Sequence, residues 1–255
     1  MDNYKEFWQN IIQKIEDLKK LDPKCKIIAS AKHYHQYQRL PVVSANTIIT
    51  FEKENKVNLP ESYRTYLQYY GAGGAGPADC ISSFFSDALR SNIVTASTYP
   101  SHVEAIKNCY FLSEDEEHPI NKLHGLLSLG HSGLGNNYLV INGKEHGLVW
   151  YWDNDYTLCN NGPFDQWYSE WVDKALLYVK SYHNYNKISQ NMKFSEIKAI
   201  METKYKINNL EDKLSFHILT FEHLPDASIK ILPDYDINKE NFTIIDIHEP
   251  RGGGL

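Results

Sequence analysis

The sequence predicts an α+β fold, with a central, largely antiparallel sheet flanked by helices and a small C-terminal α+β extension. Three observations support this class. Apolar residues recur with helical spacing before Pro23 and again over residues 44–70. Strand-like apolar runs separated by turn signals fill residues 126–152, and the composition turns rich in Asn and Lys after residue 185. We therefore expect a main domain over residues 1–184, including an N-terminal helix, and an extension of unknown role over residues 185–255.

An amphipathic helix opens the chain and stops at Pro23. A stripe as wide as this one could dock a helix of another protein, but burial against its own domain is the simpler interpretation. The apolar residues that recur at steps of three and four are Tyr4, Phe7, Trp8, Ile11, Ile12, Ile15 and Leu18.

The next stretch, residues 27–43, favours an exposed strand or an extended loop. On a strand, His33 and His35 would share one face and could hold a metal ion. No third ligand is visible nearby, so we expect neither a metal site nor a cofactor.

Two helices are expected between residues 44 and 71. Ser44 can cap the first, which fades at Asn55. Pro60 restarts the chain near a first helical turn, and Gly71 supplies the C-terminal stop. The inner stripe of this second helix consists of Tyr63, Tyr66, Leu67 and Tyr70.

Three apolar runs give the strongest strand signals. Asn142-Gly143, between the second and the third, is a strong hairpin signal. Short turns between all three predict an antiparallel meander. The runs occupy residues 126–129, 138–141 and 148–152.

The elements after the meander are a long helix and the extension. Pro163 opens the helix, whose apolar period continues to residue 179. In the extension we expect one helix that carries Phe194 and Met201. Two or three strands should complete it, at residues 216–221, 228–232 and 242–247.

Three short motifs resemble catalytic or ligand-binding sites but are incomplete. Residues 71–76 match G-x-G-x-x-G, yet a helix precedes them and Pro77 follows, so we expect a helix C-cap and a mobile loop. Residues 130–134 resemble a nucleophile elbow, but Leu134 stands at the position of the second glycine. Residues 153–155 resemble the start of a calcium loop that lacks its third ligand and its glycine. A cryptic hydrolase using Ser132 or His131 stays as an alternative.

The charge distribution argues against a protein that binds nucleic acid by neutralising phosphates. The net charge is -6, and residues 61–180 hold 7 basic and 14 acidic residues, whereas residues 1–60 hold 10 and 7. This acidic middle would steer a basic partner, although a charge that only keeps the protein soluble is the alternative.

Cysteine usage and the lack of targeting signals indicate a soluble cytoplasmic protein that contacts no membrane. No signal peptide and no apolar run of about 18 residues is visible. We expect reduced thiols, because the cysteines are far apart and show no metal spacing; they are Cys25, Cys80, Cys109 and Cys159.

Two blocks of the sequence, over roughly residues 44–180, carry a family resemblance. The first is Phe51-Glu52, a short polar gap, Leu59-Pro60, and a helix that closes at Tyr70-Gly71. The second is a strand, a glycine turn, a strand and a Gly-x-Val strand, followed by an aromatic helix. Its residues are 127–130, 133–140, 147–149, Asp153, Phe164 and Trp171. In this order and spacing, the blocks resemble the SUKH superfamily, the SMI/KNR-type proteins.

The resemblance implies an α+β domain that binds another protein and catalyses nothing. Most bacterial members are immunity proteins, and many of the toxins that they block are nucleases. We therefore expect a cytoplasmic immunity protein that occludes the active site of a cognate polymorphic toxin, a basic nuclease, without contacting nucleic acid itself. A regulatory scaffold that binds an endogenous partner through residues 185–255 is the alternative.

Charge and aromatic character select the expected partner contacts, and Trp150 and Trp152 are expected to face the core. The predicted contacts are Glu114, Asp115, Glu116, Glu117, Tyr151, Asp153, Asp155 and Tyr156.

Overall fold

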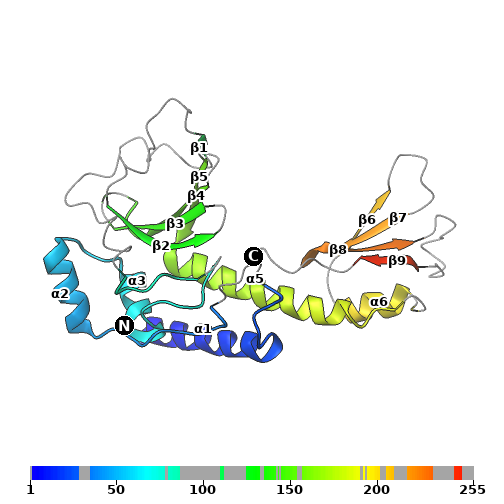
Figure 1. Ribbon diagram of the computed structural model, residues 1–255, viewed down its shortest axis with the longest axis horizontal. Coiled ribbons are helices and arrows are strands. Elements are labelled where there is room, and N and C mark those ends of the chain that lie inside the picture. Colours follow the sequence, from blue (N-terminus) through cyan, green and yellow to red (C-terminus); the bar gives the residue numbers. More distant parts are fainter. Residues whose placement is uncertain are drawn as a thin grey trace. The chain divides into compact units, whose positions relative to one another are not determined.

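The computed structural model confirms the α+β class, with two antiparallel sheets and their helices (Figure 1). Unit 1 contains residues 1–25 and 31–173, and unit 2 contains residues 26–30 and 174–254. The domain division expected after residue 184 stays a prediction. The structure describes residues 2–28, 35–77, 80–86, 110–111, 125–132, 135–141, 143, 145–153, 157–189, 192, 194–201, 205–209, 217–231 and 244–248.

Helix α1 (Asp2–Leu21) confirms the predicted N-terminal helix and ends before Pro23. Its stripe is buried within unit 1, since Trp8 and Ile15 are 0% exposed. On the outer flank, Lys14 forms an ion pair of 2.6 Å with Asp173 of helix α5 (Phe164–Tyr185). The stripe therefore belongs to the core of its own unit, as the simpler interpretation expected.

Helix α2 (Ala45–Asn55) begins and ends where the sequence predicts. The Ser44 side chain accepts a hydrogen bond from the Thr47 N–H at 3.1 Å, which satisfies one of the free donors of the first turn. Lys56, at φ 53°, terminates the helix in the left-handed region. Ile48, Phe51 and Glu52 face the interior.

The second predicted helix is α3 (Glu61–Thr65) followed by a π-helical turn, η1 (Tyr66–Tyr70). The sequence indicated one regular helix, and the π-helical turn is the difference. The Gly71 N–H donates to the Tyr66 carbonyl at 3.0 Å, five residues back. The rings of Tyr66 and Tyr70 consequently stack with their centroids 4.9 Å apart.

The glycine-rich stretch 71–76 is not the mobile loop that the sequence suggested. The Gly74 N–H donates to the Ile81 carbonyl at 2.9 Å, and the Ala75 N–H donates to the Gln38 carbonyl at 2.7 Å. The stretch is thus held between two neighbouring segments of backbone. A side chain at Gly71 would collide with the Leu40 carbonyl oxygen, so glycine is required there by close backbone approach.

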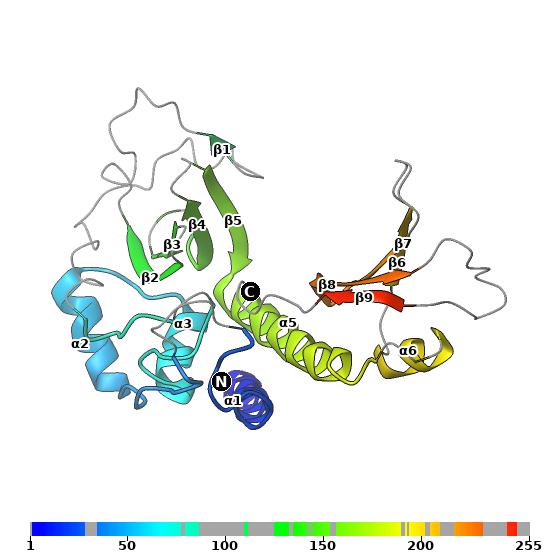
Figure 2. The same ribbon diagram turned by 45° about the vertical axis from the view of Figure 1, so that its right-hand side comes forward.

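The sheet of unit 1 confirms the antiparallel meander and adds strands to it. α1, α3 and the start of α5 lie together on one side of this sheet (Figures 1 and 2). The sequence missed the fourth long strand because its Asn160-Asn161-Gly162 segment has turn composition. In the order β1-β5-β4-β3-β2, the strands are β1 (Tyr110–Phe111), β5 (Thr157–Pro163), β4 (Leu148–Asp153), β3 (Gly135–Val140) and β2 (Leu126–Ser132).

Unit 2 has a sheet of its own, in the order β6-β7-β8-β9. The Tyr185 hydroxyl donates to the Ser228 carbonyl at 2.8 Å, and its ring packs edge-on against Phe221 at 5.7 Å. The predicted helix and three predicted strands are present, and β6 was not predicted. The elements are α6 (Phe194–Met201), β6 (Tyr205–Asn209), β7 (His217–Phe221), β8 (Leu224–Ile231) and β9 (Ile244–His248).

Within the described residues, no helix combines the length and the apolar character needed to cross a membrane.

Replacing Gly74 by alanine tests whether close packing fixes the glycine-rich stretch. Gly74 has φ +112°, and an added Cβ would collide with the Gln38 carbonyl oxygen. We expect Gly74→Ala to lower the free energy of unfolding by about 3 kcal/mol in urea titration. Gly162, at φ +84° with no atom within 4 Å of an added Cβ, is the matched control. Gly162→Ala should cost only about 1 kcal/mol, and equal losses would contradict the packing argument.

Candidate partner-binding site

The structure describes few of the predicted contact residues. Tyr151 lies in β4, opposite Asn137 of β3 and Cys159 of β5, and is half-buried. Asp153 is the last residue of β4, and its side chain is outside the description. The predicted contacts outside the described residues are Glu114, Asp115, Glu116, Glu117, Asp155 and Tyr156. The structure therefore does not bring the predicted set together, and it stays a prediction.

Two further predictions concern residues of this sheet: the burial of Trp150 is confirmed, and the reduced state of Cys159 is wrong. Trp150 is 1% exposed and faces the core, as predicted. Cys159 is disulfide-bonded, although the sequence suggested that all four cysteines are reduced. Separation along the sequence was the argument for reduced thiols, and a fold can bring distant cysteines together. Cys25 and Cys80 are not disulfide-bonded.

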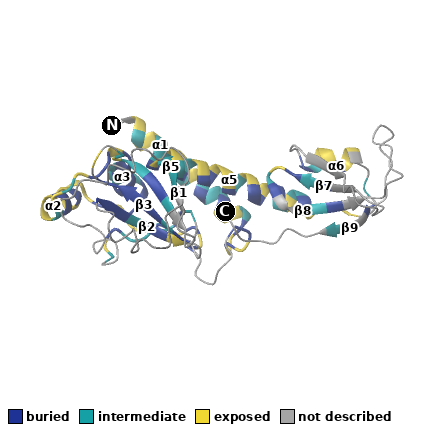
Figure 3. Ribbon diagram, turned by 90° about the horizontal axis from the view of Figure 1, so that it is seen from above, coloured by how far each residue is buried: buried dark blue, intermediate teal, exposed yellow. Residues whose placement is uncertain are grey.

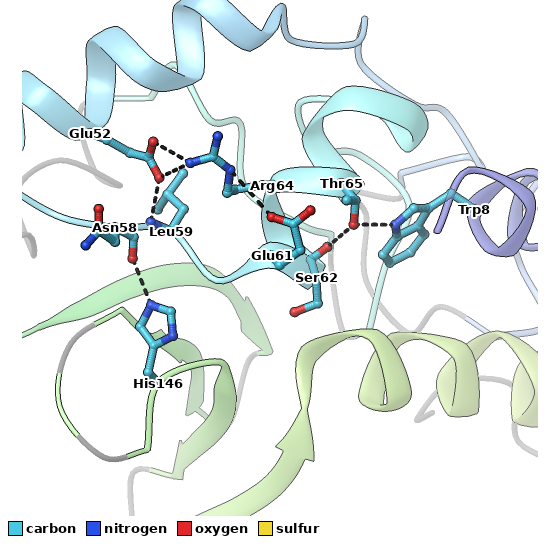
Figure 4. A network of polar contacts seen from close by, with 9 residues as sticks. All are labelled: Trp8, Glu52, Asn58, Leu59, Glu61, Ser62, Arg64, Thr65 and His146. Atoms are coloured by element: carbon cyan, nitrogen blue, oxygen red, sulfur yellow. Dashed lines mark hydrogen bonds and ion pairs between the residues drawn. The ribbon is translucent and has the colours of Figure 1, made fainter. Parts of the chain in front are cut away.

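Glu52 is the centre of a polar network that holds α2 to α3 (Figure 4). The residue is 8% exposed, and its Oε1 accepts a hydrogen bond from the Leu59 backbone N–H at 2.8 Å. Arg64 Nη1 lies 2.7 Å and 2.6 Å from the two carboxylate oxygens. A buried carboxylate is tolerated because it is paired and hydrogen-bonded in this way. The two motifs of the first family block, Phe51-Glu52 and Leu59-Pro60, are thereby joined.

The same region is connected to the sheet and to α1. His146, in the connection from β3 to β4, donates from Nε2 to the Asn58 carbonyl at 2.9 Å. Trp8 donates from Nε1 to Thr65 Oγ1 at 3.1 Å, and Thr65 donates to the Ser62 carbonyl at 3.0 Å. Contacts from α1 and from the β3–β4 connection thus reach α3 and the segment just before it (Figure 4).

The tyrosines around Trp8 are structural and uncharged. Burial raises the pKa values of Tyr63, Tyr66, Tyr70 and Tyr168 above the ordinary tyrosine value. The Trp8 ring lies 5.3 Å from the Tyr66 ring and 5.8 Å from the Tyr168 ring, in edge-to-face geometry. These side chains fill the core and do not offer a general acid or base near neutral pH.

A second cluster joins Cys25, His35, Tyr37 and Asp22 in the interior of unit 1. The Tyr37 N–H donates to His35 Nδ1 at 3.0 Å, and the Tyr37 hydroxyl donates to Asp22 Oδ2 at 3.0 Å. Cys25 Sγ lies 3.9 Å from His35 Nδ1. Burial is the main reason that the pKa of the Cys25 thiol is raised to about 11. A protonated, enclosed thiol is a packing group, and sequence spacing gave no sign of this cluster.

The described residues form neither the metal site nor the hydrolase site that the sequence left as alternatives. His33 lies outside them, and the described part of the chain has no group of three His, Cys, Asp or Glu side chains arranged for a metal ion. His131 donates from Nδ1 to the Gly135 carbonyl at 2.7 Å, across the β2–β3 turn. Ser132 is the last residue of β2 and pairs with Gly135. Both residues belong to the end of β2 that leads into the β2–β3 turn, and the Ser132 side chain is outside the described part of the chain.

One hollow lies on the outer side of α2, and the sequence did not predict it. It has a volume of about 360 Å³ and runs between α2 and the segment that contains Phe84 and Phe85. Phe85 is 54% exposed, beside an α2 face that is itself exposed (Figure 3). The available signal was the pair of adjacent phenylalanines in an otherwise irregular stretch. The lining residues are Asn46, Thr47, Thr50, Phe51, Glu54, Phe84 and Phe85.

The fold and this site define an α+β domain in which a helical pair, fixed by a buried carboxylate, packs with an antiparallel meander. The chain belongs to the SMI1/KNR4 family (SUKH-1), whose model matches residues 42–170, 129 of the 255 residues. Both motif blocks of the sequence fall in this range except for Trp171, the residue that follows it, and the match confirms the resemblance. The family is known for immunity-type proteins, which are generally non-catalytic and engage protein partners. Comparisons with curated proteins and with solved structures gave no significant match.

Removing the Glu52 carboxylate tests its role as the link between α2 and α3. Glu52→Ala leaves Arg64 and the Leu59 N–H without their partner, so we expect the free energy of unfolding to fall by about 3 kcal/mol. Glu61, whose side chain is 58% exposed and 3.8 Å from Arg64, provides the control. Glu61→Ala should change stability by about 0.5 kcal/mol or less in the same urea titration. Similar losses from both variants would show that the burial of Glu52 is not what matters.

Thiol labelling tests the enclosed state of Cys25. At pH 8 a thiol with a pKa of about 11 is almost entirely protonated, and Cys25 is 0% exposed. We expect iodoacetamide at pH 8 to modify Cys80, which is partly exposed, while Cys25 reacts only after unfolding. Deprotonation is favoured only as the pH rises through the folded pKa, so raising the pH to 9 should not release Cys25. Mass spectrometry of the labelled peptides gives the readout, and equal labelling of both residues at pH 8 would refute the assignment.

Proposed function

We propose that this chain is an immunity protein that binds the toxin domain of a bacterial polymorphic toxin and occludes its active site without catalysis. The observation that carries the proposal is the family match over residues 42–170. Proteins of this family bind protein partners, so we expect the function of this chain to depend on a binding surface and not on a catalytic site.

The charge of the chain supports a basic toxin, of which a nuclease is the example we propose. Residues 61–180 hold 14 acidic and 7 basic residues, a local charge of -7. A nuclease that binds phosphates presents positive charge in its substrate groove. An acidic surface is complementary to such a groove and accelerates encounter.

The described titratable groups support binding as the mode of action. The ring of His131 is engaged by the backbone, the thiol of Cys25 is enclosed, and the carboxylate of Glu52 is paired with Arg64. Each of these groups, which could in principle act in catalysis, contributes to the fold where it stands.

A regulatory scaffold is the second candidate, and unit 2 favours it. Residues 171–255 lie outside the family match, and unit 2 builds its own four-stranded sheet and buried core. A separate unit of this kind can supply a second binding surface. Binding of an endogenous protein with no toxin gene beside this one would favour the scaffold.

Charge reversal in the predicted acidic segment tests the immunity proposal. The probe is the toxin domain encoded beside this gene, titrated onto the full chain. Changing Glu114, Asp115, Glu116 and Glu117 together to lysine should weaken binding about tenfold or more, mainly through slower association, and should flatten its salt dependence.

The control for this reversal makes the same charge change at four exposed glutamates elsewhere. Lysine replaces each of Glu6, Glu170, Glu196 and Glu222, which are all exposed. The expected affinity of the control is close to that of the unmodified chain. If the reversal at residues 114–117 leaves affinity and salt dependence unchanged, this segment is not the contact; if the unmodified chain does not bind the toxin at all, the proposed function is wrong.

A further inference from the structure

One side of the hollow beside α2 is aromatic, and the Phe85 ring on that side is exposed. The Phe51 and Phe84 rings lie 4.7 Å apart and are 4% and 2% exposed, whereas Phe85 is 54% exposed. A backbone turn fixes this difference: the Phe85 N–H donates to Ser83 Oγ at 3.2 Å, and the Ser86 N–H donates to the Ser83 carbonyl at 2.9 Å. An exposed aromatic ring at the edge of a hollow is typical of a residue that a partner buries.

The opposite wall of the hollow is polar and carries a negative charge. Asn46, Thr50 and Glu54 follow one another at steps of four along one face of α2, and all three are exposed. The Asn46 amide and the Thr50 hydroxyl can bond to the backbone of an extended segment. Within the described residues, Glu54 forms no ion pair, so its carboxylate is available to a cation.

We infer that this hollow receives an extended segment of the toxin that carries an apolar side chain and, one or two positions along, a lysine or arginine. The inference rests on the proposed function and names a surface for it. Glu54 follows Phe51 by three residues, about 4.5 Å along the helix axis. An extended chain advances about 3.3 Å per residue, so a side chain seated on the phenylalanines places a near neighbour at Glu54.

Size and charge both favour this occupant. A hollow of about 360 Å³ accepts a few side chains and is near the lower end of ligand-sized sites. The carboxylate of Glu54, which lines the hollow, complements a basic side chain. The aromatic wall supplies the apolar contact that holds the segment in place, while the carboxylate selects the sign of the neighbouring charge.

Peptide titration tests the chemistry of the occupant directly. The full chain, labelled with ¹⁵N, is titrated with acetyl-Ala-Leu-Gly-Lys-Ala-amide and with the same peptide carrying Glu in place of Lys. We expect saturable amide shifts confined to residues 46–54 and 84–86, with the Glu peptide about fivefold weaker. Absent shifts, or equal affinity for both peptides, would overturn the inference.

Variants of the full chain test the hollow against the toxin domain encoded beside this gene. Phe85→Ser and Glu54→Lys should each weaken binding about tenfold without changing the melting temperature, because both side chains are exposed. Ile49→Ser is the matched apolar control, since Ile49 is 38% exposed on the same helix but does not line the hollow. Glu6→Lys repeats the charge change on α1, and both controls should bind within about twofold of the unmodified chain.

The outcomes separate this inference from the proposed function. If the unmodified chain binds the toxin and both hollow variants bind equally well, the inference fails and the proposed function stands. If the unmodified chain does not bind the toxin, both fail. If sedimentation shows that the chain dimerises and that Phe85→Ser abolishes the dimer, the occupant is a second copy, and the inference is overturned.

Discussion

The carboxylate of Glu52 ties the backbone at the start of α3 to the side chain of Arg64, and both helices of the family's first motif depend on it. A charge that is 8% exposed must keep these partners, because an unpaired buried carboxylate costs several kcal/mol. The contact therefore fixes how α2 meets α3. On one side of this junction the tyrosine stripe is buried, and on the other the α2 face that borders the hollow is exposed.

The tyrosine stripe explains much of the unusual aromatic content. The chain holds 18 Tyr and 5 Trp, which suit contact surfaces as well as cores. In unit 1 several of the largest buried side chains pack around Trp8, where Tyr66 stacks on Tyr70 and Phe164 meets Tyr63 edge-on at 5.2 Å. A high content of aromatic residues is thus explained better by the core of unit 1 than by a partner-binding surface. The informative aromatic residue is Phe85, which stays exposed because a turn holds it there.

The acidic segment and the hollow would contribute to binding in different ways. Exposed charge acts at long range and mainly sets the association rate, so it is sensitive to salt. An aromatic side chain that becomes buried acts at contact distance and mainly sets the dissociation rate. A family that binds proteins can therefore vary its surface charge without changing its aromatic contacts, and the reverse. This independence is a physical reason why the same α+β scaffold can serve many partners.

The sequence by itself determined the elements whose signals are local. The Ser44 cap, the stop before Pro23, the meander and the helix after Pro163 each follow from residues a few positions apart, and the family follows from the order of such elements. Only the tertiary structure decided the features that join distant residues. β5 forms despite its Asn-Asn-Gly composition because β4 offers it a hydrogen-bonded edge, and the stretch 71–76 is ordered because two other backbone segments enclose it. The disulfide at Cys159 and the hollow at Phe85 belong to the same group, because spatial proximity across the fold leaves no periodic trace in a single sequence.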